Sequence, residues 1–369
     1  MKQKNNSFRF PFYVVKRMDM SKKKIWIIKI IGILLAFLFS GIICNIFKPG
    51  SFTTYFQEML RGCFDLEDFT TFIDLLAAIS ILLLISLALL PAFKMRFWNI
   101  GAEGQILIGC LTSAGIARFA SSEMPDALVL ILCLVCSIVA SVIWTIIPAI
   151  FKAFFNTNET LFTLMMNYIA AVLVELFISL WVKNGSQTFG VLADNRVLPD
   201  LFEIEFIPVI LTAVIVTAFM FFYLKKSKQG YELSVVGESI NTARYVGINV
   251  KKVIIRTMIV GGIISGILGF LIVCGYNHTL SSTIVGGKGF TGVLIAWLGH
   301  FNPLEILLYS SLVGIFERGT TCAATAINMS ATQFSAIVTG VFFFIIIACE
   351  FFTNYQIKEH HTDKESEDK

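Results

Sequence analysis

Seven apolar stretches, each about 20 residues long, limit the fold of this chain more than any other feature. An α-helix rises about 1.5 Å per residue, so roughly 20 apolar residues cross the ~30 Å hydrocarbon core of a bilayer. The stretches are Ile25–Phe47, Ile73–Phe93, Leu128–Ile150, Leu161–Val182, Phe206–Leu224, Val253–Tyr276 and Thr332–Phe352. We therefore expect an all-α fold, a polytopic transmembrane helical bundle.

The composition leaves little room for a separate aqueous domain. Only 15% of the residues are charged and 56% are hydrophobic, whereas soluble proteins contain about 25% charged residues. We divide the chain into a basic N-terminal segment (1–24), a membrane domain (25–352) that includes a polar loop (225–252), and a charged tail (353–369).

Three further apolar segments are shorter or more polar. Ile100–Ala117 is an eighth candidate span, whereas Gly289–Gly299 and Leu304–Phe316 are too short to cross alone. An Asn302-Pro303 turn separates the last two, which predicts a re-entrant pair of half-helices over residues 289–316; two tilted spans remain the alternative. We expect about eight full spans plus this pair, or eight to ten segments in all.

Basic residues indicate the orientation of the chain. If the N-terminus is cytoplasmic and each long segment crosses once, most lysines and arginines outside the spans fall on the inner side, including those of residues 225–252. This asymmetry predicts a multi-pass protein of the cytoplasmic membrane with both termini inside. The basic N-terminal cluster suits anionic membrane lipid, and no folded basic domain indicates nucleic-acid binding.

Two glycine-rich stretches echo each other. "NIGAEGQILIGCL" begins at Asn99 and "GGKGFTGVLIAWL" at Gly286, and both lead from glycines into an apolar half-helix. In the expected topology the first enters from inside and the second from outside, as an inverted repeat requires. Coincidence between two short glycine-rich strings is the other interpretation.

The polar loop, residues 225–252, contains the signals of a short helix. Ser239 or Asn241 can cap it, Ala243 to Val246 can continue it, and Gly247 can end it. The helix would either dock into a groove on a partner or belong to a basic loop held at lipid headgroups.

Three motifs resemble one family of membrane proteins. "GESINTARYVGI" resembles the cytoplasmic loop of permease subunits in ATP-binding-cassette (ABC) importers of simple sugars and nucleosides, and "WNIGAEGQ" is similar to another signature of these permeases. "GKGFTGVLIAWLGHFNPLEILLYSSLVGIFERG" is similar to their late Gly-Phe-Thr-Gly segment. The motifs keep the family's order from Trp98 to Gly319, and the first signature resembles the nucleoside-type subgroup.

The resemblance implies a transport subunit that is not itself an enzyme. It implies a coupling helix that contacts a separate cytoplasmic ABC ATPase, through Gly237, Glu238, Asn241, Ala243, Arg244 and Gly247. The chain has no GxxxxGK[ST] phosphate loop, so we expect it to carry no cofactor while the ATPase binds ATP and Mg²⁺. The other implied partners are a second permease chain, identical or related, and an external substrate-binding lipoprotein.

The loop departs from the family pattern at two places. Ser239-Ile240 stands where an Asn-Pro pair is usual, and Val235 stands where a longer or basic residue is common. These changes preserve the helix, but the family pattern then no longer specifies which loop residues contact the ATPase.

Five polar residues are candidates for the solute pathway: Asn99, Glu103, Gln105, Asn167 and Glu175. Asn99 and Glu103 are four residues apart and would share a helical face that points into the pathway. The alternative is that Asn99 caps the helix while Glu103 stabilises its first turn. Asn167 and Glu175 would likewise line the bundle interior or make hydrogen bonds between helices.

Other chemistry has less support from the sequence. We expect no catalytic residues and no metal ligands, because neither paired carboxylates nor a nucleophile with a base occurs at a supporting spacing. An ion-coupled secondary transporter of a small polar solute is the alternative function, and an intramembrane enzyme is a third. Nucleosides and simple sugars both remain candidate small-molecule substrates.

Overall fold

The computed structural model describes residues 12–17, 20–64, 69–121, 123–182, 188–193, 196–199 and 206–359. Contacts divide the chain into two compact units. Unit 1 combines residues 1–62 with residues 319–369, and unit 2 comprises residues 63–318. In the predicted terminal segments, residues 1–11, 18, 19 and 360–369 lie outside the described residues.

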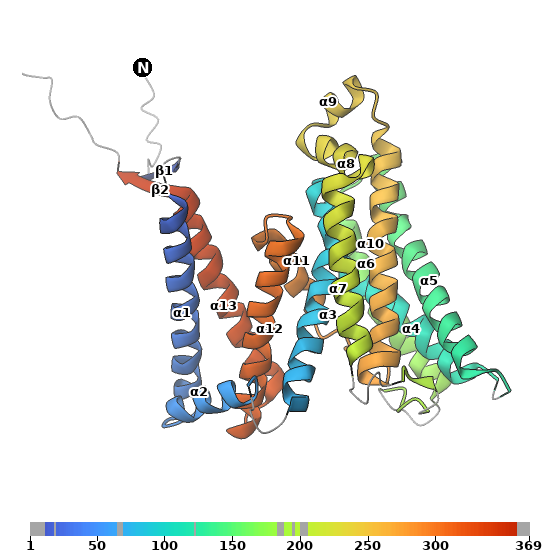
Figure 1. The fold of residues 1–369 in the computed structure, drawn as a ribbon, viewed down its shortest axis with the longest axis horizontal. Coiled ribbons are helices and arrows are strands. Elements are labelled where there is room, and N and C mark those ends of the chain that lie inside the picture. The colour runs from blue at the N-terminus through green and yellow to red at the C-terminus, as the bar shows by residue number, and fades with distance from the viewer. Residues whose placement is uncertain are drawn as a thin grey trace, which may run out of the picture. The chain divides into compact units, whose positions relative to one another are not determined.

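Unit 2 is a helical bundle that holds most of the apolar core (Figure 1). Its elements are α3 (Phe69–Lys94), α4 (Ala102–Phe119), α5 (Asp126–Phe155), α6 (Glu159–Trp181), α7 (Ile207–Lys226), α8 (Lys228–Glu238), α9 (Ile240–Tyr245), α10 (Val250–Ile272), the π-helical segment η2 (Val273–Asn277), α11 (Lys288–Leu298) and the first part of α12 (Pro303–Ala326). The most buried long helices are α3 and α10, so these two form the centre of the bundle.

Small residues let α4, α5 and α10 approach closely. A Cβ atom added to Gly269 would lie 2.8 Å from the Cα of Gly109, so these two helix backbones nearly touch. The Ser137 hydroxyl of α5 lies between two carbonyl oxygens and shares its single proton with them, that of Gly266 at 2.7 Å and that of Gly109 at 3.1 Å. Close packing of small residues with bridging hydroxyl groups is the usual way in which membrane helices associate.

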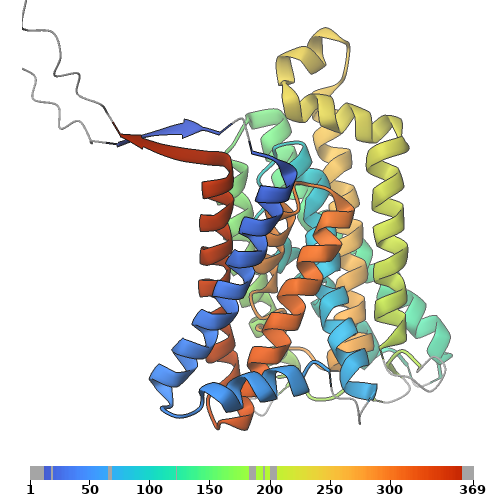
Figure 2. The same ribbon diagram turned by 60° about the vertical axis from the view of Figure 1, so that its left-hand side comes forward.

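Unit 1 joins both ends of the chain. It contains β1 (Phe12–Lys16), α1 (Lys22–Phe47), α2 (Phe52–Arg61), the end of α12, α13 (Ala331–Asn354) and β2 (Tyr355–Glu359). The strands pair antiparallel, with Lys16 opposite Tyr355, and extend from α1 and α13; the short helix α2 lies at the other end of α1 (Figure 2). The amphipathic α2 buries Tyr55, whose ring packs against that of Phe334 with centroids 6.1 Å apart.

The seven long apolar stretches are all helices of membrane-crossing length, as the sequence predicts. They correspond to α1, α3, α5, α6, α7, α10 and α13. The eighth candidate, Ile100–Ala117, corresponds to the 18-residue helix α4. The fold is therefore the expected all-α polytopic bundle.

The two short runs for which a re-entrant pair of half-helices was expected form helices of unequal length. The first run is the short α11, of 11 residues. The second, Leu304–Phe316, is wrong as a half-helix, because α12 continues to Ala326 and has 24 residues. The continuation is rich in small residues that fit between neighbours, and Thr320 exchanges a hydrogen bond with Ser335 at 3.1 Å.

Candidate functional site

Asn99 and Gln105 form a buried hydrogen-bonded pair beside the start of α4. The Asn99 Oδ1 accepts the backbone N–H of Gly101 at 2.9 Å and the Gln105 Nε2 at 3.2 Å. The helix begins at Ala102 with Gly101 as its N-cap residue, so the expectation that Asn99 caps it was wrong. Because Asn99 precedes the helix, it does not share a helical face with Glu103.

Gln105 also joins α4 to two neighbouring helices. The Ser141 hydroxyl of α5 donates to the Gln105 main-chain carbonyl at 2.9 Å. The Ser265 hydroxyl of α10 donates to the Gln105 Oε1 at 3.4 Å. Hydrogen bonds between buried polar groups favour one arrangement of the surrounding helices, and the Gln105 side chain makes such bonds with both Asn99 and Ser265.

Asn167 fastens α6 to the turn before α4. Its Oδ1 accepts the backbone N–H of Gly104 at 2.9 Å, and its Nδ2 donates to the carbonyl of Ile100 at 2.8 Å. A Cβ atom added to Gly104 would lie 2.9 Å from both the Cα and the Oδ1 of Asn167. Glycine is thus required there for the close approach, and the Asn167 amide makes inter-helix hydrogen bonds.

Glu103 holds the N-terminus of α11. One carboxylate oxygen accepts the backbone N–H of Gly287 at 2.9 Å and the other accepts that of Gly289 at 2.8 Å. The first N–H groups of a helix have no partner within the helix, and the N-terminal end of its dipole favours negative charge. Glu103 therefore satisfies two of these donors and supplies that charge.

The two glycine-rich stretches that echo each other in sequence thus meet in space. From this junction α4 runs toward Arg118, whose guanidinium carbon lies 4.6 Å from the centroid of the Phe189 ring. In the other direction α11 leads to Phe301, whose ring packs against that of Phe93 near the end of α3, with centroids 6.3 Å apart. Two short helices therefore begin at one point inside unit 2 and run toward opposite ends.

Glu175 lies apart from this junction. It is exposed on α6 and accepts a hydrogen bond from the Ser282 hydroxyl at 2.9 Å. Of the five pathway candidates, the structure brings together Asn99, Glu103, Gln105 and Asn167, but not Glu175.

The polar loop forms two helices, α8 and α9, at one end of unit 2, here called the loop end (Figure 1). Of these two, α8 was not predicted from the sequence. It packs on the end of α3, because a Cβ atom added to Gly237 would lie within 3.3 Å of the backbone of Lys94 and Met95. An ion pair of 3.0 Å between Glu232 and Arg256 ties α8 to α10.

The short helix α9 begins and ends as the sequence predicts. The Ser239 hydroxyl accepts the backbone N–H of Thr242 at 3.2 Å as an N-cap. After the last helical residue, Tyr245, the chain turns at Gly247, whose φ of 81° is the left-handed conformation that favours glycine.

The six coupling candidates divide by exposure. Gly237 and Ala243 are buried and anchor the loop, whereas Glu238, Asn241, Arg244 and Gly247 are exposed. Sequence reasoning missed three exposed apolar side chains on and beside α9, which we call the α9 apolar patch: Ile240, Tyr245 and Val246. Tyr245 is 93% exposed, so the fold of this chain makes no use of its ring.

A second set of polar residues lies at the opposite end of unit 2 and was also missed. Asp74 of α3 pairs with Arg318 of α12, and its other carboxylate oxygen accepts the hydroxyl of Tyr276 at 3.0 Å. The sequence did contain a signal for this pair, because Asp74 and Arg318 lie in or beside apolar segments. Ionisable groups in such segments are costly unless they are paired.

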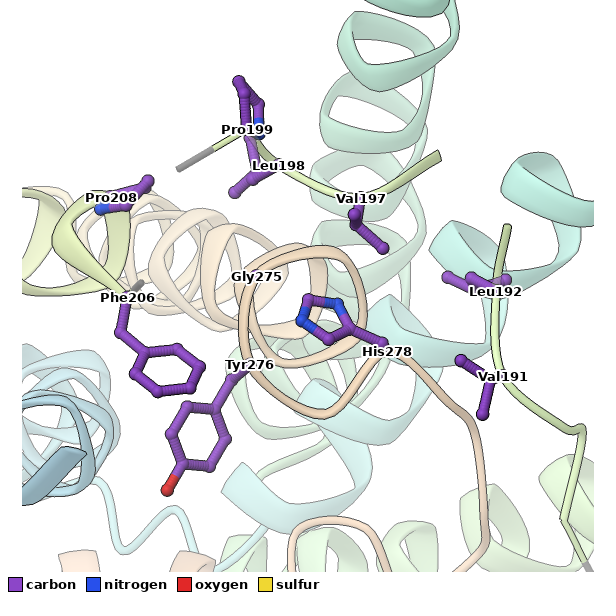
Figure 3. A pocket seen from close by; sticks show the side chains of 10 residues that line it. All are labelled: Val191, Leu192, Val197, Leu198, Pro199, Phe206, Pro208, Gly275, Tyr276 and His278. Atoms are coloured by element: carbon purple, nitrogen blue, oxygen red, sulfur yellow. The ribbon is translucent and has the colours of Figure 1, made fainter. Parts of the chain in front are cut away.

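A pocket of about 440 Å³ opens near Tyr276, at the end opposite the loop end. Residues 191, 192 and 197–199, the start of α7 and the end of η2 form its walls (Figure 3). It is lined by Val191, Leu192, Val197, Leu198, Pro199, Phe206, Pro208, Gly275, Tyr276 and His278.

Metal-binding clusters are absent from the part of the chain that the structure describes: no three His, Cys, Asp or Glu residues gather there as ligands. All eight cysteines are free thiols, each buried or half-buried.

Comparisons with known proteins agree on one class. Residues 71–347 match the family described as branched-chain amino acid transport system / permease component. The chain is 27% identical to a guanosine ABC transporter permease protein of Bacillus subtilis over 244 residues, which are 64% of this chain and 70% of the relative. It is 26% identical to a glucose ABC transporter permease protein of Haloferax volcanii over 327 residues, 85% of this chain and 84% of the relative.

A third relative is a nucleoside ABC transporter permease protein of Lactococcus lactis, 25% identical over 287 residues, which are 72% of this chain and 76% of the relative. No solved structure matches the chain significantly.

Proposed function

The chain belongs to the family of branched-chain amino acid transport system permease components, and from this premise we propose that it forms the pathway for a nucleoside. It is a multi-pass membrane protein and the permease subunit of an ABC importer for nucleosides or sugars. Nucleosides are the narrower choice, because two of the three relatives described above carry guanosine or nucleoside in their names.

The importer needs partners that supply energy and solute. An ABC ATPase and a substrate-binding protein follow from the family. In our proposal the binding protein is an external lipoprotein, a second permease chain completes the pathway, and ATP with Mg²⁺ binds to the ATPase. The loop end of unit 2 faces the cytoplasm, as do both chain termini.

The exposed surface of α9 carries the proposal. This helix is capped by Ser239, and the loop that bears it is fixed to α3 and α10 through α8, yet the α9 apolar patch remains uncovered. An apolar patch with a basic neighbour, Arg244, suits a groove on a partner that has apolar walls and an acidic rim. The rigid attachment would transmit motion of the ATPase to the bundle.

The residues around the start of α4 would serve the pathway by fixing its walls. Asn99, Gln105 and Asn167 are engaged by the chain's own groups, and Glu103 joins α4 to α11. We assign these four residues to positioning the two short helices beside the solute route, with Glu175 near its outer end.

Crosslinking tests the coupling surface. An Arg244→Cys variant should crosslink to a cysteine on the ATPase in the assembled transporter, since the native cysteines are buried or half-buried. Tyr168→Cys, at an exposed site on α6, is the matched control and should not crosslink. Absence of any crosslink from Arg244→Cys across a panel of ATPase cysteines would overturn the assignment of α9.

Transport in vesicles tests the function itself. Guanosine uptake by the full complex should require ATP hydrolysis and should persist when an ionophore removes ion gradients. Uptake that collapses with the ionophore at constant ATP would instead support an ion-coupled secondary transporter.

A further inference from the structure

The pocket of about 440 Å³ has walls held in place by backbone hydrogen bonds. The N–H of Leu192 donates to the carbonyl of His278 at 2.8 Å, and the N–H of Leu198 donates to the carbonyl of Cys274 at 2.7 Å. Leu192 and Leu198 are thus held against the end of η2. The volume lies within the range of about 300–1,000 Å³ that is typical of small-molecule sites.

The lining of this pocket is mostly aromatic and apolar. The rings of Phe206 and Tyr276 have centroids 5.0 Å apart at an interplanar angle of 54°. Among the described lining residues none is Asp, Glu, Lys or Arg. Such a surface suits a flat, neutral ring and offers a phosphate group no lysine or arginine.

One polar atom of the lining lacks a partner. The Nδ1 of His278 is buried and makes no hydrogen bond with any residue that the structure describes. An unpartnered buried polar atom is costly, and a turn of the imidazole ring that brings Nδ1 to the cavity would let a ligand with a hydrogen-bonding edge remove that cost. A nucleobase combines such an edge with a flat face that stacks on aromatic side chains.

Tyr276 belongs to two cavities. It also lines a smaller cavity of about 150 Å³ together with Ile81, Asn277 and Lys288. Lys288 is the first residue of α11, between the two glycines that Glu103 holds. The Tyr276 hydroxyl is fixed by Asp74, and the ring stands in a π-helical segment, a local structure that is frequent at functional sites.

We propose that the pocket formed by Phe206, Tyr276 and His278 receives the base of the nucleoside at the outer face, and that the Tyr276 ring separates this site from the smaller cavity. The inference rests on the proposed function, which supplies the solute and the orientation. It adds a specific acceptor site in the permease and a preference for uncharged nucleosides over nucleotides.

Guanosine uptake by the complete transporter in vesicles tests the site. Phe206→Leu keeps apolar volume but removes the ring face, and it should raise the guanosine concentration at half-maximal uptake about tenfold, equivalent to ~1.4 kcal/mol. Phe206→Tyr restores a ring and should behave like the wild type. Phe219→Leu, on the helix that Phe206 precedes but exposed and outside the lining, is the matched control and should leave guanosine uptake unchanged.

A direct binding measurement guards against indirect effects of folding. Saturation-transfer NMR on the complex without its binding protein should show magnetisation transfer to the base protons of guanosine, and Phe206→Leu and His278→Ala should weaken it. Guanosine monophosphate should give no such signal. Equal base signals in the wild type and both variants would overturn the site.

The two failures are distinguishable. If the wild-type complex does not import guanosine with ATP, the proposed nucleoside function fails. If the wild type imports guanosine and Phe206→Leu imports it with unchanged kinetics, the acceptor site alone fails.

Discussion

The Glu103 carboxylate accepts the backbone N–H of Gly289 at 2.8 Å, although 186 residues separate the two in sequence. This bond joins the first turn of α4 to the first turn of α11. Both helices begin at this contact, so its loss should destabilise the start of each helix.

Removing the Glu103 side chain should destabilise the junction. Glu103→Ala leaves the N–H groups of Gly287 and Gly289 without their acceptor, at a cost of about 1–3 kcal/mol for each buried group. Glu103→Gln keeps one side-chain oxygen as acceptor and should lose less. Thermal unfolding of the purified complex measures this order, with Glu175→Ala, at an exposed site, as the control. A Glu103→Ala protein as stable as the Glu175→Ala protein would contradict it.

Gly289→Ala should lower the melting temperature, whereas the same substitution at an uncrowded glycine should not. Its Cβ would lie 2.6 Å from the Glu103 Oε2 and 2.8 Å from the Glu103 backbone nitrogen, so the two helix starts must separate. Gly340→Ala is the control, because nothing lies within 4 Å of the Cβ it would add; there the better helix propensity of alanine should stabilise by up to ~1 kcal/mol. We expect a lower melting temperature for Gly289→Ala and a higher one for Gly340→Ala. Equal changes would contradict the close approach of α4 and α11 at Gly289.

The N-cap of α9 should affect coupling more than folding. Ser239→Ala removes the acceptor for the Thr242 N–H, a loss of about 1 kcal/mol from a six-residue helix. The helix should fray, which faster hydrogen exchange over residues 240–245 would report, and fewer solute molecules should be imported per ATP hydrolysed. Ser239→Asp, which keeps a good cap, should retain the wild-type ratio. A normal ratio in Ser239→Ala would show that α9 order is irrelevant to coupling.

The effects on stability of mutating Asp74 and Arg318 should depend strongly on each other. Either Asp74→Asn or Arg318→Gln leaves one partly buried charge without its partner, whereas the double variant leaves none. We expect the double variant to be more stable than the sum of the single effects implies, by about 0.5–3 kcal/mol. Additive effects in thermal unfolding would mean that the pair contributes nothing.

The membrane spans were predictable from the sequence because a single physical requirement, apolar length, sets them. All seven long stretches became helices long enough to cross. The length of α12 was not predictable in this way, because its second half is polar and is accommodated by neighbours such as Ser335. A hydropathy profile contains no information about a hydrogen-bonding partner on another helix.

The site was predictable as a set of residues but not as a set of contacts. Polar groups and glycines from Asn99 to Gln105 marked an unusual helix start, yet nothing local indicated that Glu103 would bind backbone groups near Lys288. Tyr245 was similarly missed, since an aromatic residue in a short helix is usually buried and only the structure shows it exposed. Long-range partners and exposure depend on packing, which a single sequence does not record.

The packing of α1 against α13 has a consequence for biogenesis. The helix α1 ends at Phe47, whereas α13, which it contacts, begins at Ala331. Because translation is sequential, all of unit 2 leaves the ribosome before unit 1 can close. The helix α1 must therefore wait in the bilayer without α13, and unit 1 closes only after unit 2 has been translated.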